Sequence, residues 1–237
     1  MAKERLDKLI SSQSMMTRSD ASKLIRSGCV SVNGNQVKNT AFKADTEADN
    51  IEVNGEKFCY KKNIYIMMNK PDGIVSASRD PKEKTVVDIV PDELKRPDLF
   101  PAGRLDKDTT GFVLITDDGE FAHNILSPRH HIDKTYLAET DKIINEDFLE
   151  NMRNGMMLGD EQLLEAEIDL VENNGNPVYR IVLREGKYHQ IKRMIASTNA
   201  NLLSLRRIRM GNLDLDENLA PGECREITQE ELKLIYN

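Results

Sequence analysis

The sequence lacks the features that mark membrane-spanning and secreted proteins. No apolar run in its 237 residues approaches the roughly 20 residues needed to span a bilayer. Its three cysteines are odd in number and far apart, so they predict neither a disulfide framework nor a C-x-x-C pair. The first residues are charged, unlike those of a secretory signal. We therefore expect a cytoplasmic protein with reduced thiols and no membrane contact.

Signatures of nucleotide cofactors and catalytic metals are also missing. The thirteen glycines never stand two positions apart, so the sequence has no G-x-G element of a dinucleotide site. It also has no G-x-x-x-x-G-K-[ST] loop of a nucleotide triphosphatase. The four histidines form neither H-E-x-x-H nor a Cys/His spacing suited to zinc. We expect neither a metal nor a cofactor.

Charge is distributed unevenly along the chain. The formal net charge of −7 argues at first against a nucleic-acid partner. However, residues 1–43 contain eight Lys/Arg against three Asp/Glu, and residues 184–210 contain seven against one. The stretch 139–172 shows the reverse, with eleven acidic residues and two basic ones. Charges act over about 10 Å in salt, so an RNA would respond to the local charge of a segment and not to the net charge of the chain. The two basic segments are therefore either RNA contacts or solvated faces.

Residues 1–60 predict a small helical unit that ends in a hairpin. Two segments with helical apolar spacing come first. The Ser-Asp pair at 19–20 is a good start for the second helix, and Gly28 can end it with a positive φ. The Asn-Gly pair at 33–34 then stands between alternating residues, which is the strongest short hairpin signal. We interpret residues 44–62 as the end of this unit and a linker.

Two stretches of this unit carry a resemblance to a known domain: R-L-D-K-L-I from position 5 and T-R-S-D-A-S-K-L-I-R-S-G-C-V-S-V-N-G-N-Q-V from position 17. With these stretches the unit resembles an S4-type RNA-binding domain. S4-type domains use a helix pair and a hairpin to present basic side chains to structured RNA. The resemblance implies that RNA phosphates are contacted by Arg5, Arg18, Lys23 and Arg26. Such contacts position the RNA without determining sequence specificity. An ordinary helix–helix–hairpin subdomain is the alternative.

Residues 61–237 predict a second, larger domain. Strand-like runs occupy 64–68, 112–116, 135–139, 165–171 and 178–183. Helical candidates occupy 120–126, 145–153 and 189–198. Strands and helices mix without a strict β-α-β order. We therefore predict an α+β fold on a mixed, mainly antiparallel sheet.

One loop of this domain contains two carboxylates that could act in catalysis. Segment 103–119 has the sequence G-R-L-D-K-D-T-T-G-F-V-L-I-T-D-D-G, which is a polar loop before a β-branched strand. Taken alone, two such loop carboxylates, Asp106 and Asp108, are usually turn residues that accept hydrogen bonds from nearby backbone N–H groups. The local sequence therefore makes Asp106 a candidate and no more.

Four motifs and a short tail segment carry a second resemblance. Segment 103–119 has R-L-D-x-x-T-T-G, an apolar strand and D-D-G. The other three motifs are M-N-K-P-D-G at 68–73, S-P-R-H-H-I-D-K-T-Y at 127–136 and E-G-K-Y-H-Q-I-K-R-M at 185–194, and the tail is L-A-P-G-E at 219–223. In this order they resemble the motifs of pseudouridine synthases of the small-subunit (16S) rRNA branch, the RsuA family, so the resemblance spans nearly the whole chain.

The resemblance implies an enzyme that isomerises uridine to pseudouridine without a cofactor. Asp106 would be the nucleophile, attacking either ribose C1′ or uracil C6. Tyr136 would lie on the flipped uracil and could relay the C5 proton. Lys192 stands where many family members have arginine. It would favour the ionised form of Asp106, although without the bidentate fork of a guanidinium.

Further arginines are candidates for RNA contact. By resemblance, Arg104 would fill the gap left by the flipped base or hold its phosphate. Arg129, Arg193, Arg206, Arg207 and Arg209 are further candidates to line the RNA track, and a solvated surface charge is the alternative for each of them.

The resemblance also implies a substrate. The partner would be ribosomal RNA, either 16S rRNA or a small-subunit assembly intermediate, and the target a uridine at position 516 of that RNA. A uridine in 23S rRNA and a non-catalytic S4-type RNA-binding protein are the alternatives. We expect a monomer.

Overall fold

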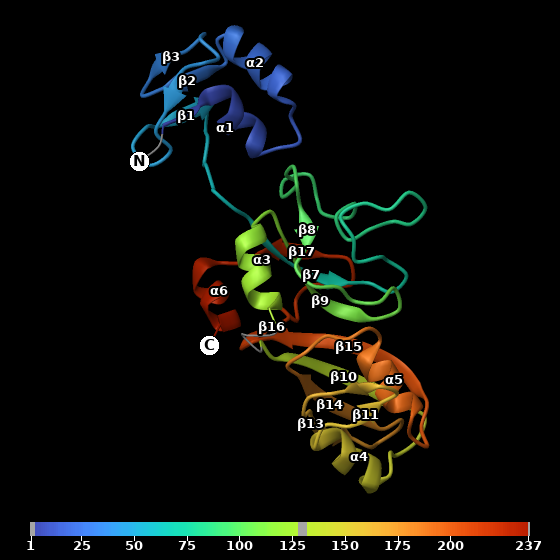
Figure 1. Cartoon of the computed structure of the whole chain (residues 1–237). Helices are drawn as coiled ribbons and strands as arrows, with labels where there is room; N and C mark the ends of the chain where they lie inside the picture. Colours follow the sequence, from blue (N-terminus) through green and yellow to red (C-terminus); the bar gives the residue numbers. More distant parts are fainter. Residues whose placement is uncertain (1–2, 128–131, 237) are drawn as a thin grey trace. The chain divides into compact units, whose positions relative to one another are not determined.

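The computed structural model describes residues 3–127 and 132–236 (Figure 1). The chain divides into two compact units, which are described separately below. The first contains Met1–Ile64 together with Val90–Leu99, and the second contains Tyr65–Ile89 and Phe100–Asn237. The boundary expected after residue 60 lies close to the first of these divisions. The return of 90–99 to the first unit was not expected, because tertiary contacts rather than local sequence assign it there.

The first unit contains two helices and short strands (Figure 1). The helices are α1 (Leu6–Ser12) and α2 (Arg18–Arg26). A four-stranded sheet has the order β3-β2-β5-β6, and β1 pairs with β4. The strands are β1 (Glu4–Arg5), β2 (Val30–Val32), β3 (Asn35–Gln36), β4 (Lys43–Ala44), β5 (Ile51–Val53) and β6 (Glu56–Lys57).

Local sequence explains most of these elements. Helix α2 begins at Arg18, earlier than the predicted Ser-Asp start, because Thr17 accepts a hydrogen bond from the Asp20 N–H at 3.2 Å. Gly28 has a φ of 81° just beyond the helix, as its sequence position predicts. The 33–34 pair forms the predicted hairpin between β2 and β3. A second Asn-Gly pair at 54–55, also with positive φ, joins β5 to β6, so the strands of the first unit continue to Lys57 within the stretch expected to hold its end and a linker.

The second unit is built on a nine-stranded sheet of order β13-β14-β10-β15-β9-β7-β17, with β16 on β15 and β8 on β9. Among the strand pairs of this sheet within the described residues, only the pairing of β15 with β9 is parallel. The predicted α+β fold with a mixed, mainly antiparallel sheet is therefore confirmed. The strands are β7 (Tyr65–Lys70), β8 (Phe100–Pro101), β9 (Thr110–Thr116), β10 (Lys134–Thr140), β13 (Glu167–Glu172), β14 (Val178–Leu183), β15 (Leu202–Met210), β16 (Leu213–Asp214) and β17 (Cys224–Glu226).

The described residues of the second unit also form four helices and a small hairpin. The hairpin pairs β11 (Met157–Leu158) with β12 (Glu161–Gln162). The helices are α3 (Gly119–Leu126), α4 (Glu146–Arg153), α5 (Gln190–Ala196) and α6 (Gln229–Tyr236). Helices α3 and α6 lie side by side over one core, and the rings of Phe121 and Tyr236 are 5.5 Å apart (Figure 1). None of the helices in 3–127 and 132–236 is long and apolar enough to cross a bilayer.

The longest strand of the sheet, β15, was not predicted. Its sequence L-L-S-L-R-R-I-R-M contains three arginines, which obscure the alternation of buried and exposed positions. Arg207 is 2% exposed, and its Nε donates a hydrogen bond of 2.8 Å to the Phe112 carbonyl of β9. The prediction that Arg207 lines an RNA surface is therefore wrong, because this side chain is enclosed where the two strands meet.

Gly111 permits the parallel contact between β9 and β15. Arg207 pairs with Gly111 in the register, and Gly111 has a φ of 95°. A Cβ atom at this position would lie 2.2 Å from the Arg207 carbonyl oxygen, which is too close for any side chain. The last glycine of the R-L-D-x-x-T-T-G motif is therefore required by backbone packing at the centre of the sheet.

We predict that Gly111→Ala lowers the free energy of unfolding by about 2 kcal/mol or more, from the strained φ and the backbone clash together. Urea unfolding followed by circular dichroism measures this change. Gly175→Ala is the matched control, because a Cβ atom at position 175 would meet nothing within 4 Å and the backbone of Gly175 does not have a positive φ in the left-handed range. Equal stability of the two variants would contradict the packing role of Gly111.

Candidate active site

The loop of residues 103–109 is anchored by Lys70, which is the last residue of β7 and is completely buried. The Lys70 ammonium donates hydrogen bonds to the carbonyl oxygens of Pro71 at 3.0 Å, Lys107 at 2.9 Å and Thr109 at 2.9 Å. Three carbonyls match the three donors of an ammonium group. Two of them belong to the loop, so Lys70 sets its position relative to β7.

Burial lowers the pKa of Lys70 to about 8. The carboxylates of Asp72, Asp108 and Asp106 act in the opposite direction and limit the fall. Lys70 is therefore largely protonated near neutral pH, which is the state that can donate three hydrogen bonds. This lysine belongs to the M-N-K-P-D-G motif, but the sequence did not indicate its role.

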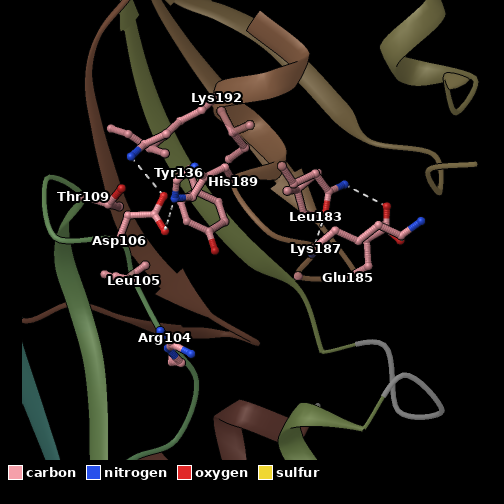
Figure 2. A pocket seen from close by; sticks show the side chains of 14 residues that line it. Arg104, Leu105, Asp106, Thr109, Tyr136, Leu183, Glu185, Lys187, His189 and Lys192 are labelled. Atoms are coloured by element: carbon pink, nitrogen blue, oxygen red, sulfur yellow. Dashed lines mark hydrogen bonds and ion pairs between the residues drawn. The ribbon is translucent and has the colours of Figure 1, made fainter. Parts of the chain in front are cut away.

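Asp106 lies between two basic side chains of the segment that starts α5 (Figure 2). Its Oδ2 is 3.0 Å from Lys192 Nζ, and its Oδ1 is 3.4 Å from His189 Nε2. The Asp106 carbonyl accepts a hydrogen bond of 3.1 Å from the Thr109 N–H, which closes a turn. Loop and helix thus bring together side chains that are 86 residues apart in sequence.

Lys192 is shared between two carboxylates. Its Nζ donates a hydrogen bond of 2.5 Å to Asp108 Oδ1 as well as contacting Asp106. Burial lowers the pKa of Lys192, but the hydrogen bonds to Asp108 and Asp106 outweigh burial, so the pKa is raised overall. The same hydrogen bond from Lys192 lowers the pKa of Asp108. Asp108, a possible turn residue in the sequence, is therefore an ionised partner of Lys192.

Tyr136 contributes its ring to the same pocket from β10 (Figure 2). The side chain is buried, and residue 136 pairs with Arg207 of β15 across the sheet. Lys134, two residues earlier, is also buried and donates a hydrogen bond of 2.8 Å to the Ile132 carbonyl. Burial, and then the nearby Arg207, lower the pKa of Lys134 to about 8. Lys134 therefore stabilises the strand and does not face solvent.

The pocket joins charged groups to an apolar wall. Leu105, Leu183, Ile191 and Leu205 supply apolar surface beside Asp106 and Tyr136. The polar residues that line it are Arg104, Thr109, Glu185, Lys187, His189, Gln190 and Lys192. Such a mixture suits a flat heterocycle with polar edges. Among residues 3–127 and 132–236, no group of three or more His, Cys, Asp or Glu side chains could hold a metal ion.

His189 is a pocket residue to which the sequence assigned no role. It precedes α5 with a φ of 49°, which is an uncommon left-handed conformation for a residue with a side chain. Such strain often persists at functional sites. The E-G-K-Y-H-Q-I-K-R-M motif contains His189, and its place beside the R-L-D loop emerges only in the folded chain.

The remaining arginines predicted to contact RNA have different surroundings in the second unit. Arg104 is exposed and lies at the edge of the pocket (Figure 2). Arg193 is tied to Glu161 at 2.7 Å and to the Leu158 carbonyl at 3.1 Å. Arg206 is half-buried. Arg209 forms an ion pair with Asp214, and Arg129 lies outside the described residues.

In the first unit, three of the four predicted phosphate contacts have acidic partners. Arg5 and Arg18 both pair with the buried carboxylate of Asp7, at 2.8 and 3.2 Å. The hydrogen bond from Arg5 is the main cause that lowers the pKa of Asp7 to about 2. The hydrogen bond from Arg18 acts in the same direction, and burial opposes both. Lys23 pairs with Asp20 at 2.8 Å. Arg26 is exposed in the last turn of α2.

Comparison with known proteins agrees with these two units. A family model described as RNA pseudouridylate synthase matches residues 64–197, and one described as S4 domain matches residues 4–51. Ribosomal small subunit pseudouridine synthase A of Escherichia coli (strain K12) is 41% identical, covering 96% of this chain and 98% of that protein. Uncharacterized RNA pseudouridine synthase YtzG of Bacillus subtilis is 39% identical and covers 98% of both.

A solved structure extends the similarity to three dimensions. A crystal structure of a pseudouridylate synthase matches with a TM-score of 0.67 and 35% identity, covering 98% of this chain and 99% of that one. Sequence and fold are thus similar over essentially the full length, and three of the four ordered motifs contribute residues to one pocket. On these grounds the chain belongs to the RNA pseudouridylate synthase family and carries an N-terminal S4 domain.

Proposed function

We propose that this protein converts one uridine of small-subunit ribosomal RNA to pseudouridine, with Asp106 as the nucleophile. The observation that carries the assignment is the position of Asp106, 3.0 Å from Lys192 in a pocket shared with Tyr136. The relatives named for the small ribosomal subunit support 16S rRNA as the substrate. Within it we propose the uridine at position 516, in free rRNA or in an assembly intermediate.

The reaction rearranges bonds within one nucleotide. The bond between uracil N1 and ribose C1′ breaks, the base turns, and a bond between C5 and C1′ forms. The C5 proton leaves and N1 gains a proton, so atoms and electrons balance without a cofactor. A carboxylate that attacks and later departs divides this change into easier steps. Attack at C1′ or at C6 requires an ionised carboxylate, and the Lys192 ammonium lies 3.0 Å from Asp106 Oδ2.

Tyr136 and Arg104 would act on the flipped nucleotide. The buried ring of Tyr136 can stack on uracil, which contributes roughly 1–3 kcal/mol per base. Its hydroxyl is a candidate for relaying the C5 proton. Arg104 stands exposed at the pocket edge, where it can hold the phosphate or replace the flipped base. Such contacts would offset the few kcal/mol that base flipping costs.

The S4 domain would hold the RNA while the catalytic unit acts. Arg26 is exposed on α2, and Arg5, Arg18 and Lys23 could contact phosphates without leaving their acidic neighbours. We also propose that the protein acts as a monomer, in the cytoplasm where ribosomes are assembled.

We predict that a strain lacking the protein loses one pseudouridine from 16S rRNA. Wild-type protein should restore it, whereas Asp106→Asn should not, because an amide is a poor nucleophile. Mapping pseudouridine along both large rRNAs measures the outcome. Asp108→Asn is the matched control, since it alters a carboxylate of the same loop that also contacts Lys192. Loss of a pseudouridine from 23S rRNA instead would show that 23S rRNA is the substrate. Full activity of Asp106→Asn would show that Asp106 is not the nucleophile.

We predict that Lys192→Gln lowers kcat by roughly 10²-fold or more, because two carboxylates lose their shared cation. Lys192→Arg should recover much of this loss, since charge is retained although the geometry differs. Tritium release from C5-labelled rRNA under single-turnover conditions measures the rate. Wild-type activity of Lys192→Gln would show that Asp106 does not need this ion pair.

A further inference from the structure

An exposed aromatic ring stands at the rim of the active-site pocket. Tyr188 is 76% exposed and is the most exposed of the large hydrophobic side chains among the described residues. Its ring stacks on His189, with centroids 3.8 Å apart and planes at 17°. His189 lines the pocket and lies 3.4 Å from Asp106. The inner face of Tyr188 is therefore covered by a pocket residue, while much of the ring reaches solvent.

The chain segment under this ring is firmly held. The Gln190 N–H donates to the Lys187 carbonyl at 3.2 Å, and the Lys187 N–H donates to Gln190 Oε1 at 3.1 Å. Gln190 Nε2 is bonded in turn to Glu185 at 2.7 Å (Figure 2). The Tyr188 carbonyl accepts a hydrogen bond of 3.4 Å from Arg193 Nη1. This tight turn fixes Tyr188 before any ligand arrives, which reduces the entropy lost on binding.

The surroundings favour a nucleic-acid base over a protein side chain as the occupant. Lys187, Lys192 and Arg104 line the adjoining pocket, so the ring lies next to cations that suit an RNA backbone. Unpaired bases bind proteins by stacking on aromatic rings close to such cations. Flipping a uridine into the pocket also breaks the stacking of the nucleotides beside it. A neighbouring base would therefore arrive unstacked at the pocket rim.

We propose that the outer face of Tyr188 is a stacking site for the base next to the flipped uridine. This inference rests on the proposed function, since it places Tyr188 one nucleotide away from the target. Tyr136 would then hold the target base and Tyr188 its neighbour. Stacking is tolerant of sequence, so this site contributes RNA affinity and holds the flipped state without selecting the neighbouring base.

Two variants at this position test the aromatic face. Tyr188→Leu keeps apolar bulk but removes the ring, and Tyr188→Phe keeps the ring but removes the hydroxyl. With rRNA as substrate, we expect Tyr188→Leu to raise KM about tenfold with little change in kcat, and Tyr188→Phe to match wild type. Tyr236→Leu is the control, because Tyr236 is a partly exposed tyrosine outside the pocket. Thermal unfolding of each variant verifies folding.

A second measurement does not require turnover. A uridine-rich single-stranded oligonucleotide with one 2-aminopurine reports stacking, because the fluorescence of this purine falls when it stacks. We expect quenching with wild type and Tyr188→Phe, and much less with Tyr188→Leu. Equal quenching and equal KM for Tyr188→Leu and wild type would overturn the proposal, as would equal losses in Tyr188→Leu and Tyr188→Phe. If the wild-type protein quenches the fluorescence but modifies no rRNA, the proposed function fails while the stacking of RNA bases on Tyr188 stands.

Discussion

Burying the ammonium group of Lys70 is costly, and its three carbonyl partners offset that cost together with the charges of nearby carboxylates. Lys70 and the loop therefore constrain each other. The loop that carries Asp106 must bring the Lys107 and Thr109 carbonyls to the end of β7, or a buried charge would remain unsatisfied. A buried side chain that does not line the pocket thus determines where Asp106 lies. Gly111, a few residues later, lets β9 continue against β15.

The second constraint is the charge balance around Lys192. A single ammonium faces Asp106 and Asp108, while His189 approaches Asp106 from another side. An ammonium has three donors that rotate about one stem, so it can serve two carboxylates of different orientation. A planar guanidinium would favour a bidentate contact with one of them. A lysine at position 192 therefore suits a loop with two carboxylates, because it can contact Asp108 as well as Asp106.

Several features of the fold could be predicted because their causes are local. The Asn-Gly hairpin at 33–34, the end of α2 at Gly28 and the strand 178–183 all depend on neighbouring residues. Strand β15 could not be predicted, because the burial of Arg207 depends on β9, some 95 residues away in sequence. The first unit raises the same difficulty, since Arg5 and Arg18 are surface cations in the sequence but partners of a buried Asp7 in the structure.

The sequence by itself determined the order of the four motifs, the mixed α+β class, the basic N-terminal module and the candidacy of Asp106. These depend on residue type and spacing along the chain. Only the tertiary structure decided which side chains surround Asp106. Lys70, His189 and Lys192 reach the R-L-D loop from distant segments, and a contact between distant segments is formed by packing rather than by local preference. The environment of the carboxylate, unlike its identity, is therefore a property of the folded chain.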